Sequence, residues 1–213
     1  MQYPMNMELG GRRCVVLGGG PVARRKVGTL RQAGASVLVI APSVSPELEA
    51  LAESGEIQWR RAPYEQGCLR DAFLVICATD DEAVNRQAAA EARQRGVLVN
   101  APAQPELSDF SVPASLRRGN LLLTVSTGNL SPALSRALRE HLDREFPPMF
   151  GEWLERLHLL REEVRARLGS SREREAFWRD ALNEHILELV GTGRIEQAEV
   201  EVRHAIDGNR TEP

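Results

Sequence analysis

One stretch of the sequence decides the fold: Cys14-Val-Val-Leu-Gly-Gly-Gly-Pro-Val-Ala-Arg-Arg-Lys26, in which an apolar strand turns through three glycines directly into an amphipathic helix. Gly18 permits a tight turn, and Gly20 lets the backbone approach a bound group closely. Pro21 suits the first helical turn, where its missing N–H costs nothing. The free N–H groups and the positive dipole end of this helix therefore form a seat for an anion.

The same residues match the dinucleotide fingerprint G-x-G-x-x-A, in which helix amides hold a pyrophosphate. Ala23 replaces the third glycine and is small enough for the helix to pack closely on the strand. The expected cofactor contacts in this stretch are Gly18, Gly20, Pro21, Val22 and Ala23. The pattern also occurs in glycine turns that bind no nucleotide, so the surrounding sequence has to decide between the two.

After this stretch, short apolar runs alternate with helical patterns. The runs, which are typical of buried parallel strands, are Ser36 to Ala41, Ile57 to Arg61, Phe73 to Ala78 and Val97 to Asn100. An alanine-rich helix is expected over Glu82–Arg95. In the first helix, the residues expected near one buried face are Val22, Val27, Leu30 and Ala33. Strands that alternate with helices predict an α/β fold with a Rossmann-like doubly wound parallel sheet.

Ligands of such a sheet bind beyond the carboxyl ends of its strands. Besides the glycines, the residues at these ends that we expect in the cofactor site are Pro42, Ser43, Thr79 and Asn100. Ile40-Ala41-Pro42-Ser43 contains no acidic residue for a ribose 2′-hydroxyl and no arginine for a 2′-phosphate, so NAD is only modestly favoured over NADP.

The chain changes character after Asn100. A proline-punctuated connection leads out of the first domain, a basic turn is expected at Arg117–Asn120, and an apolar strand follows at Leu121–Ser126. Ser131 caps and Pro132 begins the next helix. The loop between Ser126 and Ser131 is either a second anion site or the ordinary start of a well-capped helix. We expect domains at residues 1–112, 113–147 and 148–213.

Helical patterns dominate the rest of the chain. A three-four spacing of apolar residues runs from Phe150 to Leu168 and continues in a second helix from Phe177 to Leu189. These faces need a partner, and we favour a homodimer. The charges around Arg161–Arg167 and at Glu173–Glu175 are interpreted as solvated helix faces. Residues 207–213 are interpreted as a frayed end.

Bulk composition restricts the partners. The chain of 213 residues has a net charge of -3, which argues against a general nucleic-acid binder. We find no secretory signal and no apolar stretch that spans a bilayer, and therefore expect no membrane partner and a cytoplasmic location. The three cysteines and four histidines show no metal-ligand spacing, so no metal site is assigned.

The sequence resembles the precorrin-2 dehydrogenase family, the dehydrogenase and ferrochelatase module of sirohaem synthases. The matching residues are Tyr3-Pro4, Gly18–Lys26, Ala35 with Val39–Pro42, Ala78–Asp81, Asn85, Val99-Asn100, Asp109-Phe110 with Pro113-Ala114, and Ser126–Pro132. The resemblance covers about the first 150 residues with specific spacing. The helical remainder is similar to the dimerisation and substrate-covering region of that family.

This resemblance implies NAD-dependent oxidation of precorrin-2 to sirohydrochlorin, followed in bifunctional members by insertion of ferrous iron. The substrate is a tetrapyrrole with many carboxylates, which arginine recognises well. Its expected contacts are Arg117, Ser126, Thr127 and Asn129, with Arg118, Arg136 and Arg139 as further candidate anchors. Thr127 occupies a position where relatives often carry serine.

One departure from the family concerns its acid/base aspartate, which follows the asparagine in many relatives. Here the matching residue is Ala103. Iron insertion should suffer more than oxidation, because two pyrrole protons must leave as the metal enters. Asp109 is the expected catalytic substitute, with Glu106 as an alternative.

Two other functions stay open on the sequence. The substitution at Ala103 is compatible with a non-catalytic regulator that binds NAD or a tetrapyrrole with the same fold. The nucleotide-binding domain of a transport regulator is less favoured, because such domains usually present an acidic residue after the second strand.

Overall fold

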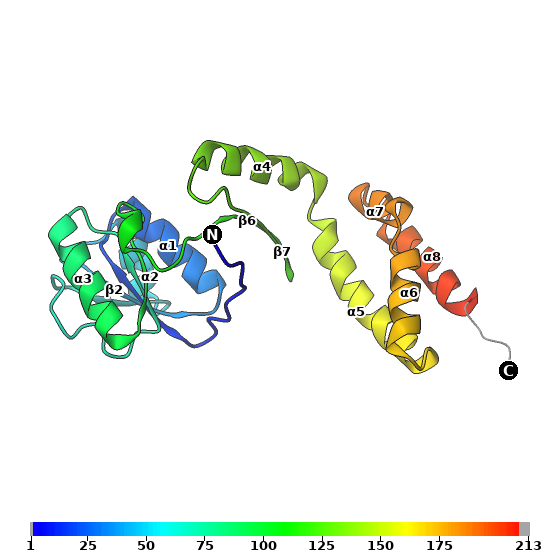
Figure 1. The fold of residues 1–213 in the computed structure, drawn as a ribbon, viewed down its shortest axis with the longest axis horizontal. Helices are drawn as coiled ribbons and strands as arrows, with labels where there is room; N and C mark the ends of the chain where they lie inside the picture. Colours follow the sequence, from blue (N-terminus) through cyan, green and yellow to red (C-terminus); the bar gives the residue numbers. More distant parts are fainter. Residues whose placement is uncertain (1, 209–213) are drawn as a thin grey trace. The chain divides into compact units, whose positions relative to one another are not determined.

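The computed structural model describes residues 2–208 and divides into two compact units, residues 1–112 and residues 113–213. Figure 1 traces the chain through both units. The three predicted domains remain a prediction.

The first unit is built on a parallel five-stranded sheet with the strand order β3-β2-β1-β4-β5. The strands are β1 (Arg13–Leu17), β2 (Ser36–Ile40), β3 (Gln58–Arg60), β4 (Leu74–Cys77) and β5 (Leu98–Asn100). The predicted Rossmann-like doubly wound sheet is thus confirmed, and each end of strands β2 to β5 lies at the predicted limit or one residue inside it.

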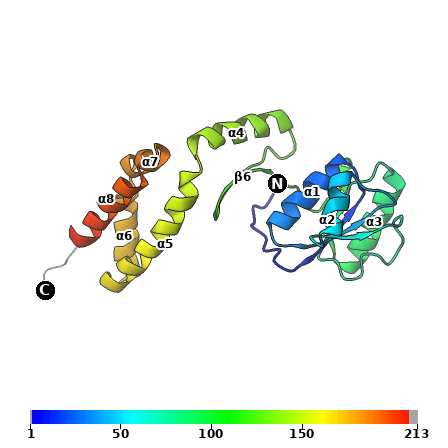
Figure 2. The same ribbon diagram turned by 180° about the vertical axis from the view of Figure 1, so that it is seen from behind.

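Both faces of this sheet are covered. Helices α1 (Pro21–Gln32) and α2 (Pro46–Glu53) pack on one face, and α3 (Glu82–Arg95) packs on the other (Figures 1 and 2). Side chains alternate along the buried strand β1, with Val16 in the first layer and Leu17 in the second. The helix α3 has the predicted limits, whereas α2 was not predicted.

The buried face of α1 differs from the predicted one at its first position. Ala23, Val27 and Leu30 are buried, but Val22 is 41% exposed. The spacing of the three buried residues defines a stripe along the helix, and Val22, one residue before Ala23, lies about 100° away from it. The prediction that Val22 shares one face with Val27 and Leu30 was therefore wrong.

Between residues 113 and 208, the second unit contains a hairpin and five helices. Its elements are β6 (Ala114–Arg118), β7 (Leu121–Val125), α4 (Pro132–Glu145), α5 (Met149–Arg167), α6 (Ser171–Ala181), α7 (Glu184–Gly191) and α8 (Ile195–Gly208). The core of this unit joins α5 to α8, with Leu160 and Leu189 fully buried. The helix α4 packs on the hairpin and buries none of its residues fully.

Three details of this unit correct the sequence-based expectations. Arg117 and Arg118 belong to strand β6 because they pair with β7, so the turn is only Gly119-Asn120. The predicted second helix is two helices, because α6 ends at Ala181 and Asn183 caps α7 by accepting from the Ile186 amide (3.1 Å). Asp207 is still helical and pairs with Arg167, while residues 209–213 of the predicted frayed end lie outside the described residues.

A buried carboxylate ties the loop between β3 and β4 to α3. Glu91 accepts hydrogen bonds from the Tyr64 hydroxyl (2.7 Å), the Gly67 amide (2.9 Å), the Leu69 amide (3.3 Å) and Arg95 Nε (2.8 Å). Burial alone would raise the pKa of Glu91, but these donors stabilise the ionised form and lower it overall. Nothing in the residues around Glu91 in the sequence predicts this anchor.

Removing this anchor should destabilise the first unit. We expect Glu91→Ala to lower the free energy of unfolding by about 3 kcal/mol, because the buried groups that donate to Glu91 would be left without an acceptor. Because the folded pKa of Glu91 lies below its ordinary value of 4.5, the stability advantage of the wild type over Glu91→Gln should shrink as the pH falls through that folded pKa. Denaturant titration across pH measures both effects.

The matched control is Glu82→Gln, an exposed carboxylate at the start of the same helix that pairs with Arg86. This change should cost no more than about 0.5 kcal/mol. Equal losses in the Glu91 and Glu82 variants would contradict the anchoring role.

Candidate functional site

Three loops meet at the carboxyl ends of β1, β2 and β4. The Gly18 amide donates to the Ile40 carbonyl (3.1 Å), and the Ser45 amide donates to the Gly19 carbonyl (2.9 Å). Gly18 has φ +108°, and a Cβ there would lie 2.3 Å from the Ala78 carbonyl oxygen. A side chain at Gly18 is therefore excluded both by conformation and by space.

The strand order places this junction where ligands of doubly wound sheets bind. The connections run in opposite directions from β1 and β4, so the edge beyond these two strands is a topological switch point. The structure brings the predicted residues of three strand ends together here, with the Ser43 carbonyl oxygen 2.1 Å from where a Cβ of Gly19 would stand.

The N-terminus of α1 is open. Its N-cap residue, Gly20, supplies no side-chain cap, and the first turn contains Pro21 and no acidic residue. In α3, by contrast, Asp81 accepts from the Ala83 and Val84 amides (2.9 and 3.1 Å). The first amides of a helix have no partner within the helix, and because Pro21 has no N–H, the amides of Gly20, Val22 and Ala23 at the start of α1 are left for another acceptor.

The space above this helix end fits a close ligand. Apart from its two neighbours in the chain, no atom of residues 2–208 lies within 4 Å of a Cβ built on Gly20, whereas Gly18 and Gly19 are packed against backbone. Packing therefore requires glycine at positions 18 and 19, whereas Gly20 faces open space. This arrangement suits a diphosphate held on the α1 amides.

Thr79 and Asn100 stand at the ends of β4 and β5. The hydroxyl of Thr79 is 2.8 Å from Asn85 Oδ1, and Asn85 Nδ2 donates to the Thr79 carbonyl (3.0 Å), so a buried asparagine fixes this loop. Asn100 Nδ2 donates to the Phe110 carbonyl (2.9 Å), while its buried Oδ1 has no partner within residues 2–208. A buried acceptor without a donor is ready for a ligand or a water molecule.

The loop after β5 holds the predicted catalytic carboxylate. Asp109 Oδ2 accepts from the Val99 amide (2.9 Å), and the Asp109 amide donates to the Val99 carbonyl (2.8 Å). One carboxylate oxygen therefore fixes the loop against β5. Ala103 is exposed, and Gln104 beside it is buried with both side-chain polar atoms unpartnered within residues 2–208. No sequence signal distinguishes Gln104 from a surface glutamine.

The residues predicted to bind substrate lie in the second unit. The Thr127 hydroxyl is 3.0 Å from both the Ser131 carbonyl oxygen and Ser135 Oγ, so it ties the loop to the start of α4. Ser126 Oγ accepts from the Gly128 amide (3.2 Å), and Asn129 adopts φ +66°. The loop is thus ordered by its own polar groups.

The two arginines of β6 differ. Arg117 is exposed, whereas Arg118 pairs with Asp143 (2.6 Å) and donates to the Phe146 carbonyl (2.8 Å). Arg118 is occupied in joining the hairpin to α4, which leaves Arg117 as the freer anchor for a ligand carboxylate. The guanidinium of Arg118 also lowers the pKa of Asp143.

Within the described residues, no group of three or more His, Cys, Asp or Glu side chains is arranged to hold a metal ion. None of the helices described between residues 2 and 208 has the length and apolar character needed to cross a bilayer.

The sheet, the glycine turn and the open helix end together define a Rossmann-type protein that binds a dinucleotide. The chain belongs to the family described as "Putative NAD(P)-binding", whose model matches residues 5–114. A second model, "Sirohaem synthase dimerisation region", matches residues 150–206.

Relatives extend the similarity over nearly the whole chain. The chain is 37% identical to "Siroheme synthase" of Nitrosococcus oceani over 209 residues and 40% identical to that of Methylococcus capsulatus over 208 residues. These alignments cover 98% and 97% of this chain but only 45% and 44% of the relatives, so the chain spans about half of their length.

A solved structure is similar over its full length. It is "SirC, precorrin-2 dehydrogenase", with a TM-score of 0.76 and 25% sequence identity, and the match covers 97% of this chain and 100% of that one. These findings confirm the family resemblance predicted from the sequence.

The open space at Gly20 provides a test of the diphosphate seat. We expect Gly20→Val to fold normally, because its Cβ meets no protein atom, and to weaken NAD⁺ binding about tenfold or more by blocking the approach of the diphosphate. Titration calorimetry with NAD⁺ and thermal unfolding measure the two effects.

The control is Gly18→Val, which should lower the melting temperature sharply because its side chain would overlap the backbone at Ala78. A Gly20→Val protein that binds NAD⁺ like the wild type would remove the diphosphate from this position.

Proposed function

We propose that this chain catalyses the NAD-dependent oxidation of precorrin-2 to sirohydrochlorin. The observation that carries the proposal is the open, uncapped glycine seat at α1 in a chain that matches a precorrin-2 dehydrogenase over nearly its whole length. When bound, NAD⁺ supplies the acceptor for a hydride. The substrate loses that hydride and one proton, and the products are sirohydrochlorin, NADH and the released proton.

The chain's own residues position the reactants. The α1 amides and Gly20 hold the diphosphate, and Thr79 and Asn100 lie at the neighbouring strand ends, where the buried Asn100 Oδ1 accepts from a bound group. Because the end of β2 carries neither a carboxylate nor an arginine, backbone and the Ser43 hydroxyl meet the adenosine ribose.

The tetrapyrrole binds through its carboxylates. Arg117 supplies an exposed guanidinium, and the loop from Ser126 to Asn129 supplies hydroxyl, amide and backbone donors. The Thr127 hydroxyl donates to the Ser131 carbonyl, accepts from the Ser131 amide (3.2 Å) and contacts Ser135 Oγ, so we assign it the role of holding this loop in shape for the ligand.

We assign the proton acceptor to Asp109. Its Oδ2 is bound to the Val99 amide, and its exposed carboxylate follows the strand end that carries Asn100. Asparagine at this position retains an oxygen for the Val99 amide, so Asp109→Asn removes the charge while keeping the loop in place.

Anaerobic turnover tests the function. We expect NADH and sirohydrochlorin to appear together from precorrin-2 and NAD⁺, and Asp109→Asn to reduce kcat about a hundredfold with little change in NAD⁺ binding. Absorbance at the NADH and sirohydrochlorin bands measures both products. Unchanged turnover in Asp109→Asn would remove Asp109 from the reaction, and saturable binding of precorrin-2 without NADH would favour the non-catalytic regulator.

Insertion of ferrous iron is a separate activity, and Ala103 removes the family carboxylate from the loop that would serve it. In the same assay with Fe²⁺ added, sirohaem formation should be slow in the wild type. Ala103 is exposed, so Ala103→Asp is accommodated without repacking and should speed iron insertion about tenfold or more. No gain would show that position 103 does not limit chelation.

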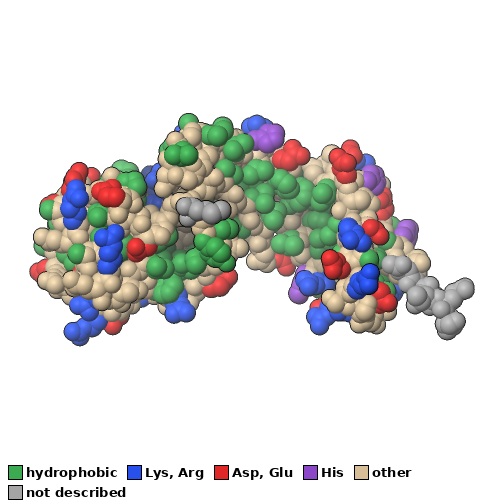
Figure 3. Space-filling model, in the orientation of Figure 1, with side chains coloured by type: hydrophobic (Ala, Val, Ile, Leu, Met, Phe, Trp, Pro, Cys, Tyr) green, Lys and Arg blue, Asp and Glu red, His purple; other side chains and the backbone are tan. Residues whose placement is uncertain are grey.

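We also propose that the chain forms a homodimer through its second unit. Apolar side chains gather over the hairpin, α4 and the first turns of α5 (Figure 3). Leu134 and Leu138, one helical turn apart on α4, are 50% and 42% exposed, and the strands of the hairpin leave Leu122 only half-buried. The dimerisation-region model matches residues 150–206, which follow the hairpin and α4 in the chain and include the first turns of α5, and this match favours a second copy as the group that covers the surface.

A charge on this face should separate the protomers. We expect Leu134→Glu to shift the mass measured by light scattering from dimer to monomer, since a carboxylate would be buried at the interface. The control is Met5→Glu, because Met5 is an exposed apolar side chain of the first unit. This change should leave the dimer intact. A Leu134→Glu protein that stays dimeric would place the interface elsewhere.

A further inference from the structure

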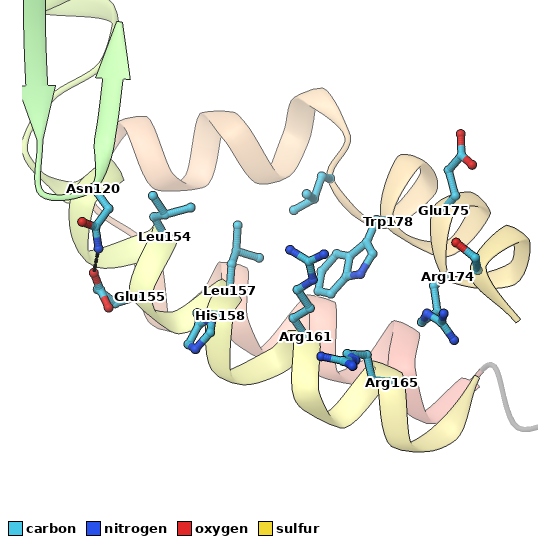
Figure 4. Close-up of a pocket in the computed structure, with 12 residues that line it drawn as sticks. Asn120, Leu154, Glu155, Leu157, His158, Arg161, Arg165, Arg174, Glu175 and Trp178 are labelled. Atoms are coloured by element: carbon cyan, nitrogen blue, oxygen red, sulfur yellow. Dashed lines mark hydrogen bonds between the residues drawn. The ribbon is translucent and has the colours of Figure 1, made fainter. Parts of the chain in front are cut away.

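A large groove lies between α5 and α6 and belongs entirely to the second unit. Its volume is about 1040 Å³, which is in the range of small-molecule sites. Leu157, Leu182 and Trp178 supply its apolar surface (Figure 4). The groove contains none of the residues assigned above to cofactor or substrate.

Arginines surround this apolar surface. Arg161 and Arg165 project from α5, Arg174 projects from α6, and Figure 4 shows Arg161 extending toward the Trp178 ring. Arg161 has no hydrogen bond or ion pair within residues 2–208. Arg174 donates to the Leu168 and Gly169 carbonyls (2.9 and 3.0 Å).

The arginines on the other side of α5 are used differently. Arg156 pairs with Glu152 and Glu199 (2.7 and 2.9 Å), and its neighbour on α8, Arg203, pairs with Glu163 (2.6 Å). The face toward α8 is therefore neutralised by carboxylates of this chain. The groove face retains a positive excess that an external anion can use.

The two carboxylates at the groove do not cancel this excess. Glu155 accepts from Asn120 Nδ2 (2.8 Å), at the turn of the hairpin, and so is directed to one end. Glu175 projects from α6 away from Trp178 (Figure 4). Arg165 has an exposed partner in Glu162, at 3.3 Å, which a ligand carboxylate can replace at little cost.

We propose that this groove binds a flat molecule that carries several carboxylates. Planar guanidinium groups match carboxylates at the edge of such a ligand, and the indole of Trp178 together with the leucines matches its flat apolar body. The volume admits a macrocycle. The choice of a porphyrinoid carboxylate as the ligand rests on the proposed function, whereas the preference for flat polycarboxylates rests on the groove alone.

Uroporphyrin, an air-stable octacarboxylate, is the probe, and the full-length protein is titrated with it. Uptake is measured by quenching of tryptophan emission and by the shift of the porphyrin absorbance. We expect Arg161→Ala and Arg165→Ala each to weaken binding about tenfold, and Arg161→Lys to recover part of the loss. Trp178→Phe should reduce the quenching while the absorbance shift persists.

The matched control is Arg172→Ala, because Arg172 is an exposed arginine of α6 that does not line the groove. Its affinity for uroporphyrin should equal that of the wild type. The tetracarboxylate and dicarboxylate porphyrins should bind progressively more weakly, and added salt should weaken all three.

Several outcomes would overturn the proposal. Equal affinity of the wild type and both groove variants would place the porphyrin elsewhere. A variant that loses its dimer together with its uptake would assign the groove to the partner chain. NADH formation from precorrin-2 is measured separately. A protein that forms no NADH but takes up uroporphyrin through these arginines would refute the proposed function and support the groove as a binding site.

Discussion

The first unit depends on a crossing of backbones at the carboxyl edge of its sheet. The turn after β1 runs between the loops after β2 and β4 so closely that neither Gly18 nor Gly19 has room for a Cβ. This contact joins three strand ends into one surface and fixes where α1 begins. The proposed diphosphate site thus follows from packing, because the crossing positions the start of α1, and this helix start has no side-chain cap.

Much of this arrangement could be predicted because its causes are local. The glycine spacing, Pro21 and the alternation of apolar runs with helical patterns are each readable in a short window of sequence, and together they predict the doubly wound sheet. The side chain of Val22 was misplaced because its assignment relied on hydrophobicity alone, although the helical phase set by Ala23, Val27 and Leu30 turns it outward.

The features that the sequence did not reveal depend on contacts between distant residues. Glu91 looks like one more charge on a helix until the loop that contains Tyr64 and Gly67 folds back on it. The same holds for Arg161, which the charge pattern placed on a solvated face. Only the packing of α6 beside α5 converts that face into a wall of the groove.

The second unit divides its arginines between two uses. The arginines that face α8 form ion pairs with carboxylates of this chain, whereas the arginines toward α6 have few carboxylates beside them. The uncapped N-terminus of α1 has a consequence for the stability of the protein. The coenzyme that we propose for this site would bind the free amides of α1 in the native state alone, and such binding favours the native state by mass action. We therefore expect the protein without coenzyme to be less stable and to be cleaved more readily by proteases.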